Sequence, residues 1–330
     1  MPRLSHALRA TFAFAFGAGC AVAAPRRASA QGDVSKEGAA FLLVPIGASV
    51  VGGGQAVVAS EVGATGVWWN PASIARMRTK EFTLDYSHNF IADGLALSSV
   101  FPAGRAGVFA VGAYILDLGT QEATDQFGTI GTILPRDYVF DATYAATMGR
   151  HVSLGVSYKF IQQRTDCTGA CGNLPLLVSS GGAVDIGMQV AVDSARRLVI
   201  GAAVRNAGSA FQVNDIDQAD PLPTRLHLGA RYLVPGLAAK VPDGELALMG
   251  EVAMRPAGGN TSWRGGAEFA FKKQVFLRAG YAGGSGDLAG ATIGIGARRG
   301  ALSFDFARAF GGVSSDAGAP PTYVTLRFAF

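Results

Sequence analysis

The sequence has no clean membrane helix after its first thirty residues, although 49% of its 330 residues are hydrophobic. Charged residues are scarce, at 16%, and the net charge of +4 is modest. Because the basic residues are scattered and no stripe of aromatics accompanies them, we expect no nucleic-acid binding. Short strands with an apolar side chain at every second position explain high hydropathy without long apolar runs.

Motifs for catalysis are also missing. The sequence holds no zinc-protease helix motif, phosphate loop or dinucleotide fingerprint, and the glycines of 294–300 have the wrong spacing for the last of these. Ser87-His88-Asn89 alone invites an enzymatic interpretation, since some outer-membrane lipases place Ser and His on a barrel strand. No orienting carboxylate or oxyanion loop can be assigned to it. We therefore predict a protein that is not an enzyme and has neither metal nor cofactor.

Only three cysteines are present. Cys167 and Cys171 lie in a loop-like segment, and we predict that they form a small local disulfide, because paired cysteines of an exported chain usually do so. Metal binding by the same pair would need two more ligands. Neither a His nor a pair of acidic residues stands nearby at the usual spacing.

The N-terminus carries the features of an export signal. Basic residues precede an apolar stretch at 10–24, and a small-residue cleavage site follows at 28–30. This pattern predicts that residues 1–30 are a cleaved secretory signal peptide. Cys20 leaves lipidation as an alternative, although Gly17 occupies the position where a lipobox has Leu.

From residue 81 onward the sequence divides into about fourteen strand-like segments, each near the length of about ten residues that a tilted strand needs to cross a bilayer. They are 81–90, 94–101, 105–115, 137–147, 151–161, 182–192, 198–206, 224–233, 244–254, 262–271, 274–282, 289–298, 301–310 and 321–330. A soluble β-sandwich would alternate too, with its apolar residues inside. The connections, however, alternate between tight and long except at 91–93 and 234–243, with long loops expected at 116–136, 162–181 and 207–223. This parity favours a bacterial barrel with short periplasmic turns.

The last eight residues follow the same two-residue rhythm. One predicted face carries Val324, Leu326, Phe328 and Phe330, and the other carries Tyr323, Thr325 and Arg327. Such a strand, apolar toward lipid and polar toward the lumen, resembles the closing strand of a bacterial outer-membrane β-barrel. We interpret Tyr323, Leu326, Phe328 and Phe330 as its assembly signal. The expected partners are the barrel assembly machinery and outer-membrane lipid.

An uncharged stretch at 38–60 separates the signal peptide from the first strand and contains Pro45 and the triplet Gly52-Gly53-Gly54. It is long enough to cross a membrane as a helix, but Pro and clustered Gly each weaken a helix interior. A plug folded inside a barrel lumen fits the composition better. We therefore assign 31–78 to an N-terminal plug and 79–330 to a transmembrane antiparallel β-barrel of about 14 strands.

The run at 47–59, followed by 66–75, resembles the N-terminal signature of the PorV/PorQ family, relatives of the FadL transporters. In that family a glycine-rich run containing Gly-Met-Gly leads to an aromatic-Asn-Pro-Ala-Gly-Leu element just before the barrel. Here Gly53 replaces the Met and Ser73-Ile74 replaces Gly-Leu, whereas Trp69-Asn70-Pro71-Ala72 is intact.

The motif has two interpretations. It consists of Gly52, Gly53, Gly54, Trp68, Trp69, Asn70, Pro71 and Ala72. As a structural corner, Asn70-Pro71 forms a turn that seats the plug against the wall. As the FadL likeness implies, the plug and the lumen beneath it form a site or passage for an apolar ligand.

The resemblance also implies an outer-membrane location and one of two roles. The main expectation is a component of type IX-like secretion that engages exported proteins at the outer surface. The alternative is a FadL-like transporter for hydrophobic small molecules such as fatty acids.

The predicted lumen face carries charges of both signs. They include Asp85, Asp141, Lys159, Asp185, Arg205, Arg225, Arg231, Glu251, Glu268, Arg278, Arg298, Asp305 and Arg327. These side chains could line a polar passage. Pairing across neighbouring strands is the better expectation for many of them, because an unpaired buried charge is costly.

Overall fold

The computed structural model describes residues 37–89, 91–169, 177–212, 219–256, 261–283, 290–311, 318 and 320–330. The predicted signal peptide (1–30), Cys20, the first residues of the predicted plug and Cys171 lie outside the described residues. Within the described part of the chain, no helix is long and apolar enough to cross a membrane.

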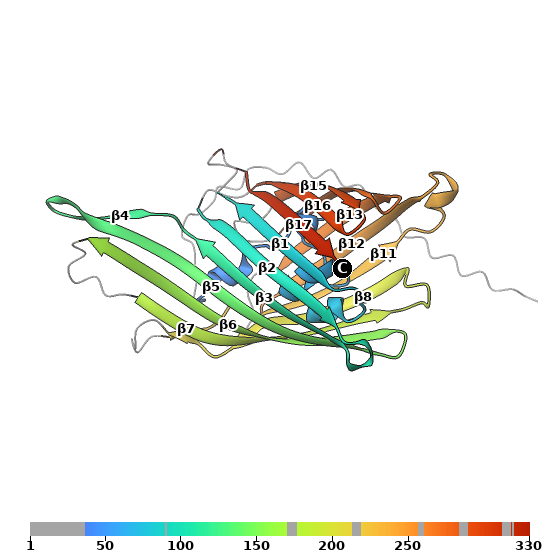
Figure 1. Cartoon of the computed structure of the whole chain (residues 1–330), viewed down its shortest axis with the longest axis horizontal. Helices are drawn as coiled ribbons and strands as arrows, with labels where there is room; N and C mark the ends of the chain where they lie inside the picture. Colours follow the sequence, from blue (N-terminus) through green and yellow to red (C-terminus); the bar gives the residue numbers. More distant parts are fainter. Residues whose placement is uncertain are drawn as a thin grey trace, which may run out of the picture. The chain divides into compact units, whose positions relative to one another are not determined.

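Fourteen antiparallel strands close into a barrel (Figure 1). They are β1 (Glu81–His88), β2 (Asp93–Pro102), β3 (Val108–Asp117), β5 (Gly128–Met148), β6 (Val152–Gly169), β7 (Leu177–Ala191), β8 (Leu198–Gly208), β11 (Arg225–Leu233), β12 (Gly244–Met254), β13 (Ser262–Phe271), β14 (Val275–Gly283), β15 (Gly290–Arg299), β16 (Leu302–Phe310) and β17 (Thr322–Ala329). The first strand pairs with the last, so that Glu81 lies opposite Ala329, and β3 pairs with β5. A closed wall satisfies its backbone hydrogen bonds internally, as lipid requires.

Two ends of the barrel can be named from the connections. The turn end holds Glu81, Ala329 and the tight connections at 149–151, 272–274 and 300–301, whereas the loop end holds His88. Short helices η4 (Gly104–Ala106) and η5 (Leu237–Ala239) lie in two further connections at the turn end. The predicted alternation of tight and long connections is thus present apart from the short connection at 89–92 and the longer one at 234–243. By the parity of bacterial barrels, we expect the turn end to face the periplasm.

Two of the three predicted long loops are largely strand, so this part of the sequence-based expectation is wrong. β4 (Gln121–Asp125) forms a hairpin with the first part of β5, β6 continues to Gly169, and β7 already begins at Leu177. These strands project beyond the rest of the wall at the left of Figure 1. Outside the bilayer a strand needs no apolar side facing lipid, so the alternation of apolar and polar residues that predicts the strands is absent there. The third loop contains a small ribbon of β9 (Phe211–Gln212) and β10 (Ala219–Asp220).

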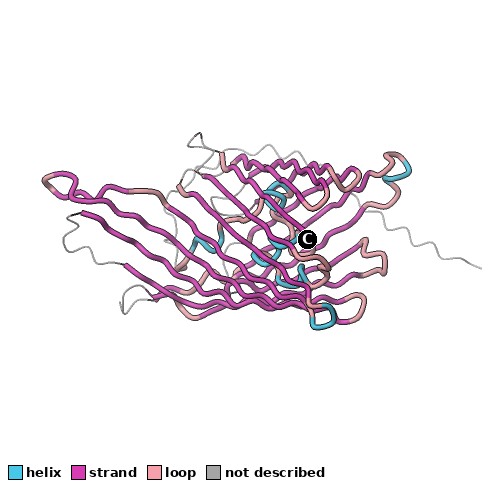
Figure 2. The backbone as a smooth tube through the Cα atoms, viewed as in Figure 1, coloured by secondary structure: helices cyan, strands magenta, loops and turns pink. Residues whose placement is uncertain are grey.

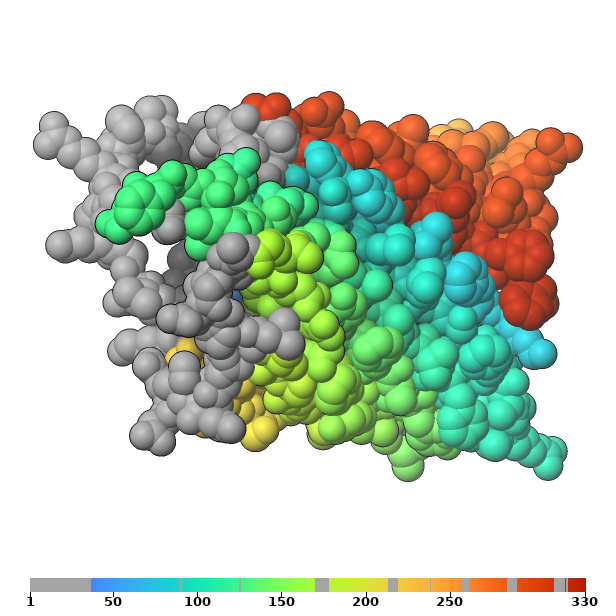
Figure 3. All heavy atoms as spheres, turned by 60° about the vertical axis from the view of Figure 1, so that its left-hand side comes forward, coloured from blue at the N-terminus to red at the C-terminus, as the bar shows by residue number. Residues whose placement is uncertain are grey.

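Apolar side chains of the wall point outward, and its charged side chains point inward. In β17, Phe328 is 47% exposed, whereas Thr325 is fully buried and Arg327 is 8% exposed. This arrangement is the reverse of a soluble β-sandwich, so that alternative is wrong. On the face drawn in Figure 3, β1 to β3, β5 and β6 form a continuous outer wall. Its apolar exterior is the surface that acyl chains contact.

Residues 37–80 fold inside the ring of strands as the plug (Figure 2). Its short helices are η1 (Ala40–Leu43), α1 (Ala48–Gly52), η2 (Gly63–Trp68) and η3 (Pro71–Ile74). The longest of the four spans 6 residues, so the stretch at 38–60 is not a membrane helix. Almost all apolar side chains of the plug are buried against the wall or against each other.

Candidate functional site: the plug and the cavities beside it

The plug glycines lie against glycines of the barrel wall. A Cβ atom on Gly52 would lie 2.8 Å from the Cα of Gly294, inside van der Waals contact. Gly54 has a φ of +72°, and a Cβ atom there would overlap the carbonyl oxygen of Gly265. A Cβ atom on Gly280 would in turn overlap the backbone of Gly54. Backbone therefore packs directly on backbone, which only glycine permits.

Asn70 forms the corner that the sequence indicates. Its backbone is extended (φ −150°, ψ 109°), and Pro71 begins η3. The Oδ1 atom accepts from the Ala72 N–H at 3.0 Å, and Nδ2 donates to the Val58 carbonyl at 2.6 Å and to the Met188 carbonyl of β7 at 3.4 Å. The side chain is completely buried. One amide therefore joins two parts of the plug to the wall.

The two tryptophans of the plug, Trp68 and Trp69, anchor it through their indole N–H groups. Trp68 donates to the Ser98 hydroxyl of β2 at 2.8 Å, and Trp69 donates to the Ile46 carbonyl at 2.9 Å. The guanidinium groups of Arg205 and Arg264 lie 4.9 and 5.7 Å from the centre of the Trp69 ring. Cations at these distances from an indole are attracted by its π face.

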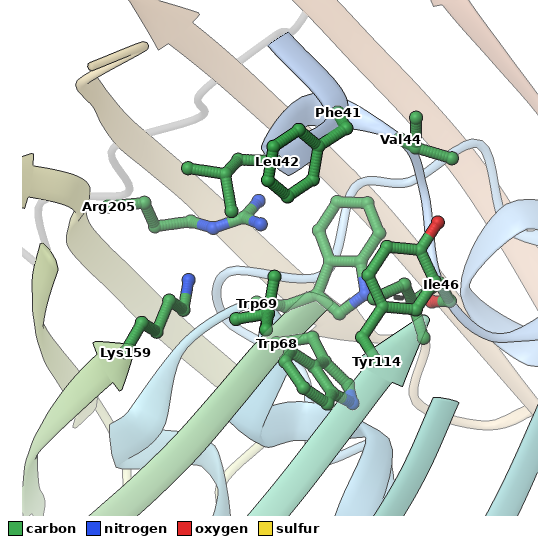
Figure 4. A pocket seen from close by; sticks show the side chains of 10 residues that line it. Phe41, Leu42, Val44, Ile46, Trp68, Trp69, Tyr114, Lys159 and Arg205 are labelled. Carbon is green, nitrogen blue, oxygen red and sulfur yellow. Dashed lines mark hydrogen bonds between the residues drawn. The ribbon is translucent and has the colours of Figure 1, made fainter. Parts of the chain in front are cut away.

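A small aromatic cavity lies on the loop side of the plug (Figure 4). It is lined by Phe41, Leu42, Val44, Ile46, Trp68, Trp69, Tyr114, Val139, Lys159 and Arg205. Its volume of about 20 Å³ has room for little more than one water molecule. We call it the loop-side pocket.

The loop-side pocket has one polar corner. Lys159 is neutralised by Asp185 at 2.5 Å and also donates to Asn206 at 3.0 Å. The hydroxyl of Tyr114 and the Nε of Arg205 have no hydrogen-bond partner within the described part of the chain. The pocket thus offers a mostly apolar surface, with the unpaired hydroxyl of Tyr114 and the cation of Arg205 at its edge.

A β-bulge in β8 produces this corner. The register shifts opposite Asp185, and Asn206 has a φ of 57° while its N–H donates to the Asp185 carboxylate at 2.7 Å. Two consecutive residues, Arg205 and Asn206, therefore both face the lumen and are buried. Sequence reasoning missed Asn206, and also Phe41, Leu42 and Tyr114. The only available signal was the pair of adjacent polar residues that interrupts the alternation of β8.

Most of the predicted lumen charges are paired. Arg278 contacts Glu268 and Asp305, each at 2.6 Å. Glu251 contacts His227 at 2.7 Å and accepts from the Val58 N–H of the plug at 2.9 Å. The remaining pairs include Lys159 with Asp185, Arg225 with Glu37, Arg264 with Glu251, and Arg327 with Glu81. The charges hold strands to one another and the plug to the wall, as expected for buried ions.

Glu37 fixes the first described part of the plug at the loop end. Its carboxylate contacts Arg225 at 2.7 Å and Arg255 at 2.6 Å. Burial by itself would raise the pKa of Glu37, but hydrogen bonds and charge from the two arginines hold that pKa below its ordinary value. The carboxylate is therefore ionised at neutral pH.

A second and larger cavity lies on the turn side of the plug. Its volume is about 410 Å³, and it reaches from plug residues such as Gly53 and Val57 to Lys273 in a tight turn. We call it the turn-side vestibule. The plug therefore separates a nearly filled pocket from an open space.

The remaining predicted residues lie away from these cavities. Cys167, in β6, is disulfide-bonded, but Cys171 lies outside the described residues, so their pairing stays a prediction. Ser87 is buried toward the lumen, whereas His88 is exposed and contacts Asp93 at 2.7 Å. Because Ser87 and His88 point to opposite faces of β1, they cannot act together as a catalytic pair.

No family model and no curated protein matches the sequence. Solved structures do match. The toluene transporter TbuX of Ralstonia pickettii has a TM-score of 0.58 at 13% identity, with 88% of this chain and 100% of that chain covered. The toluene transporter TodX of Pseudomonas putida has a TM-score of 0.55 at 12% identity, with 85% and 95% covered. A FadL homologue of Pseudomonas aeruginosa has a TM-score of 0.53 at 10% identity, with 87% and 98% covered.

At such low identity the likeness establishes a FadL-like barrel fold and nothing finer. None of these comparisons supports the PorV/PorQ resemblance seen in the sequence. They give no support to the expected secretion role either.

Proposed function

We propose that this protein is an outer-membrane transporter that admits hydrophobic small molecules through the loop-side pocket and the lumen. The observation that carries the proposal is an aromatic pocket, enclosed between plug and wall, inside a barrel of the FadL-like fold. Two solved structures with this fold are those of toluene transporters. Transport, which the sequence offered as the alternative, replaces secretion as the preferred function.

The pocket chemistry suits an apolar ligand. Phe41, Leu42, Trp68 and Trp69 supply aromatic and aliphatic surface from the plug, and Arg205 and Lys159 enter from the wall on one side (Figure 4). Ligand sites are mostly apolar with a few polar groups that fix orientation. The polar corner would fill that role for a ligand with a polar end.

The volume indicates that the passage is closed in this conformation. Small-molecule sites usually measure about 300–1,000 Å³, and the pocket measures about 20 Å³. Phe41 and Leu42 occupy the space beside Trp69, so a ligand must displace plug side chains before it can bind. A closed resting state would also preserve the permeability barrier of the membrane.

The proposal is tested by uptake into a Gram-negative host that lacks its own transporter of this class. Radiolabelled long-chain fatty acid and toluene are supplied at low concentration, and uptake is compared with and without the protein. Val139 is almost fully buried in the pocket wall, and Val139→Trp would fill the pocket. The neighbouring Phe140 points outward and is 53% exposed, so Phe140→Trp is the matched control.

We expect the protein to raise uptake of at least one of the two compounds. Val139→Trp should reduce that uptake severalfold, while Phe140→Trp should not change it. Heat-modifiable migration on gels verifies that both variants form barrels. Uptake no higher than in the empty host, with folded protein in the outer membrane, would rule out the proposed function for these compounds.

A further inference from the structure

The turn-side vestibule is a cavity of ligand size with a defined charge imbalance. Its volume of about 410 Å³ lies within the usual range for small-molecule sites. Six cationic side chains and four carboxylates line it. Because Glu81, outside the lining, pairs with Arg327, the net excess is one positive charge, and walls of low dielectric strengthen its field.

The carboxylates of the vestibule are already engaged. Glu61 contacts Arg196 at 2.6 Å, and Glu245 contacts Lys273 at 3.2 Å. Glu268 and Asp305 both contact Arg278. Arg327 pairs with Glu81, which lies outside the vestibule lining. Among the described residues, Arg231 and Arg298 are the vestibule cations that no carboxylate neutralises.

Arg298 is held in place without being neutralised. Its Nε donates to the Ser303 hydroxyl at 3.0 Å, and its guanidinium lies 5.6 Å from the centre of the Phe276 ring. Both partners are uncharged, and they leave the two terminal nitrogens without a hydrogen-bond partner within the described part of the chain. A positioned guanidinium with free terminal N–H groups matches the two oxygens of a carboxylate.

Apolar surface lies beside these cations. Val57, Ala59 and Val62 line the vestibule on the side of the plug, and Met249 and Phe276 line it on the side of the barrel wall. We propose that the vestibule binds small amphiphilic anions, with the carboxylate at Arg298 or Arg231 and the apolar tail against the plug. This second site lies on the opposite side of the plug from the loop-side pocket, and its occupation does not depend on transport.

Equilibrium binding tests the proposal on the full-length barrel in nanodiscs of uncharged lipid. Octanoate and the neutral octanamide are titrated by calorimetry as probes of equal length. The variants are Arg298→Gln, Arg231→Gln and Arg298→Lys. The matched control is Arg299→Gln, because Arg299 follows Arg298 in β15 and does not line the vestibule.

Octanoate should bind the unmodified protein more tightly than octanamide does. Arg298→Gln or Arg231→Gln should weaken octanoate binding by about threefold to tenfold, as for one partly exposed charged hydrogen bond. Arg298→Lys should keep part of that affinity, and Arg299→Gln should change nothing. Equal affinity for the two probes would overturn the proposal, as would a loss of octanoate affinity in Arg205→Gln and none in either Arg298→Gln or Arg231→Gln. Octanoate binding that persists while uptake fails would contradict only the proposed transport.

Discussion

We predict that removal of the Asn70 side chain, which joins two parts of the plug to the wall, makes the barrel leak. Asn70→Ala deletes the bond that satisfies the Ala72 N–H and the bond to the Val58 carbonyl. The Val58 carbonyl keeps a second donor, Gln189 Nε2 at 3.0 Å. The Ala72 N–H, in contrast, loses its acceptor at a fully buried position.

The magnitude follows from these bonds. A buried donor left without an acceptor costs about 1–3 kcal/mol, and the loss of a satisfied side-chain hydrogen bond adds about 1 kcal/mol. We expect the docked plug to lose about 2–4 kcal/mol relative to displaced conformations. At about 1.4 kcal/mol per factor of ten, displaced conformations become roughly 30-fold to 700-fold more populated.

The assay is the sensitivity of cells to a large hydrophilic antibiotic that the outer membrane normally excludes. Cells with Asn70→Ala should become more sensitive than cells with the unmodified barrel. Asn89→Ala is the control, since Asn89 makes the same kind of side-chain bonds to the backbone at 91 and 92 but lies at the exposed loop end. Equal sensitivity of Asn70→Ala and Asn89→Ala cells, at equal amounts of folded barrel, would refute a plug that Asn70 holds closed.

Three further predictions follow from individual contacts. Gly280→Val should displace the plug and raise the same antibiotic sensitivity, because its side chain overlaps the backbone of Gly54; unchanged sensitivity would contradict backbone-on-backbone docking. The lowered pKa of Glu37 means that its ion pairs contribute fully above the ordinary pKa of Glu and are lost as pH falls through the lowered one. Proteolysis of the plug should therefore increase at acid pH in the unmodified barrel but not in Glu37→Gln. If acid increases proteolysis equally in both proteins, Glu37 does not hold the plug through its ion pairs. Phe330→Ala should lower the yield of heat-modifiable barrel, because it removes the ring that stacks on Phe328 at the end of the closing strand; a normal yield would argue against an assembly signal there.

The barrel could be predicted from sequence because lipid imposes a simple rule on each crossing segment. Each of the fourteen predicted segments overlaps a strand, and those from 244–254 to 321–330 match the observed boundaries within one residue. Where the strands leave the bilayer, both faces meet water and the apolar alternation disappears. The ends of β5, β6 and β7 at the loop side were therefore misplaced by between five and nine residues.

The site was only half predictable, for a different reason. The glycine triplet and Asn70 could be recognised because tight packing and a turn before proline each demand a particular residue. Phe41, Leu42 and Tyr114 look like ordinary apolar residues in sequence, and their meeting depends on how the plug crosses the lumen. The bulge at Asn206 was equally hidden, since its register depends on Asp185 in the neighbouring strand.

The position of the plug sets a condition on any transport mechanism. The loop-side pocket and the turn-side vestibule lie on opposite sides of a segment whose backbone touches wall glycines such as Gly294 and Gly280. No side chain can rotate away at such a contact, so a passage there requires the plug backbone itself to move. Movement near η1 is less restricted, because Phe41 and Leu42 meet the wall through side chains that can adopt other rotamers. A ligand should therefore enter beside η1 first, and only a later displacement of the glycine triplet would connect the pocket to the vestibule.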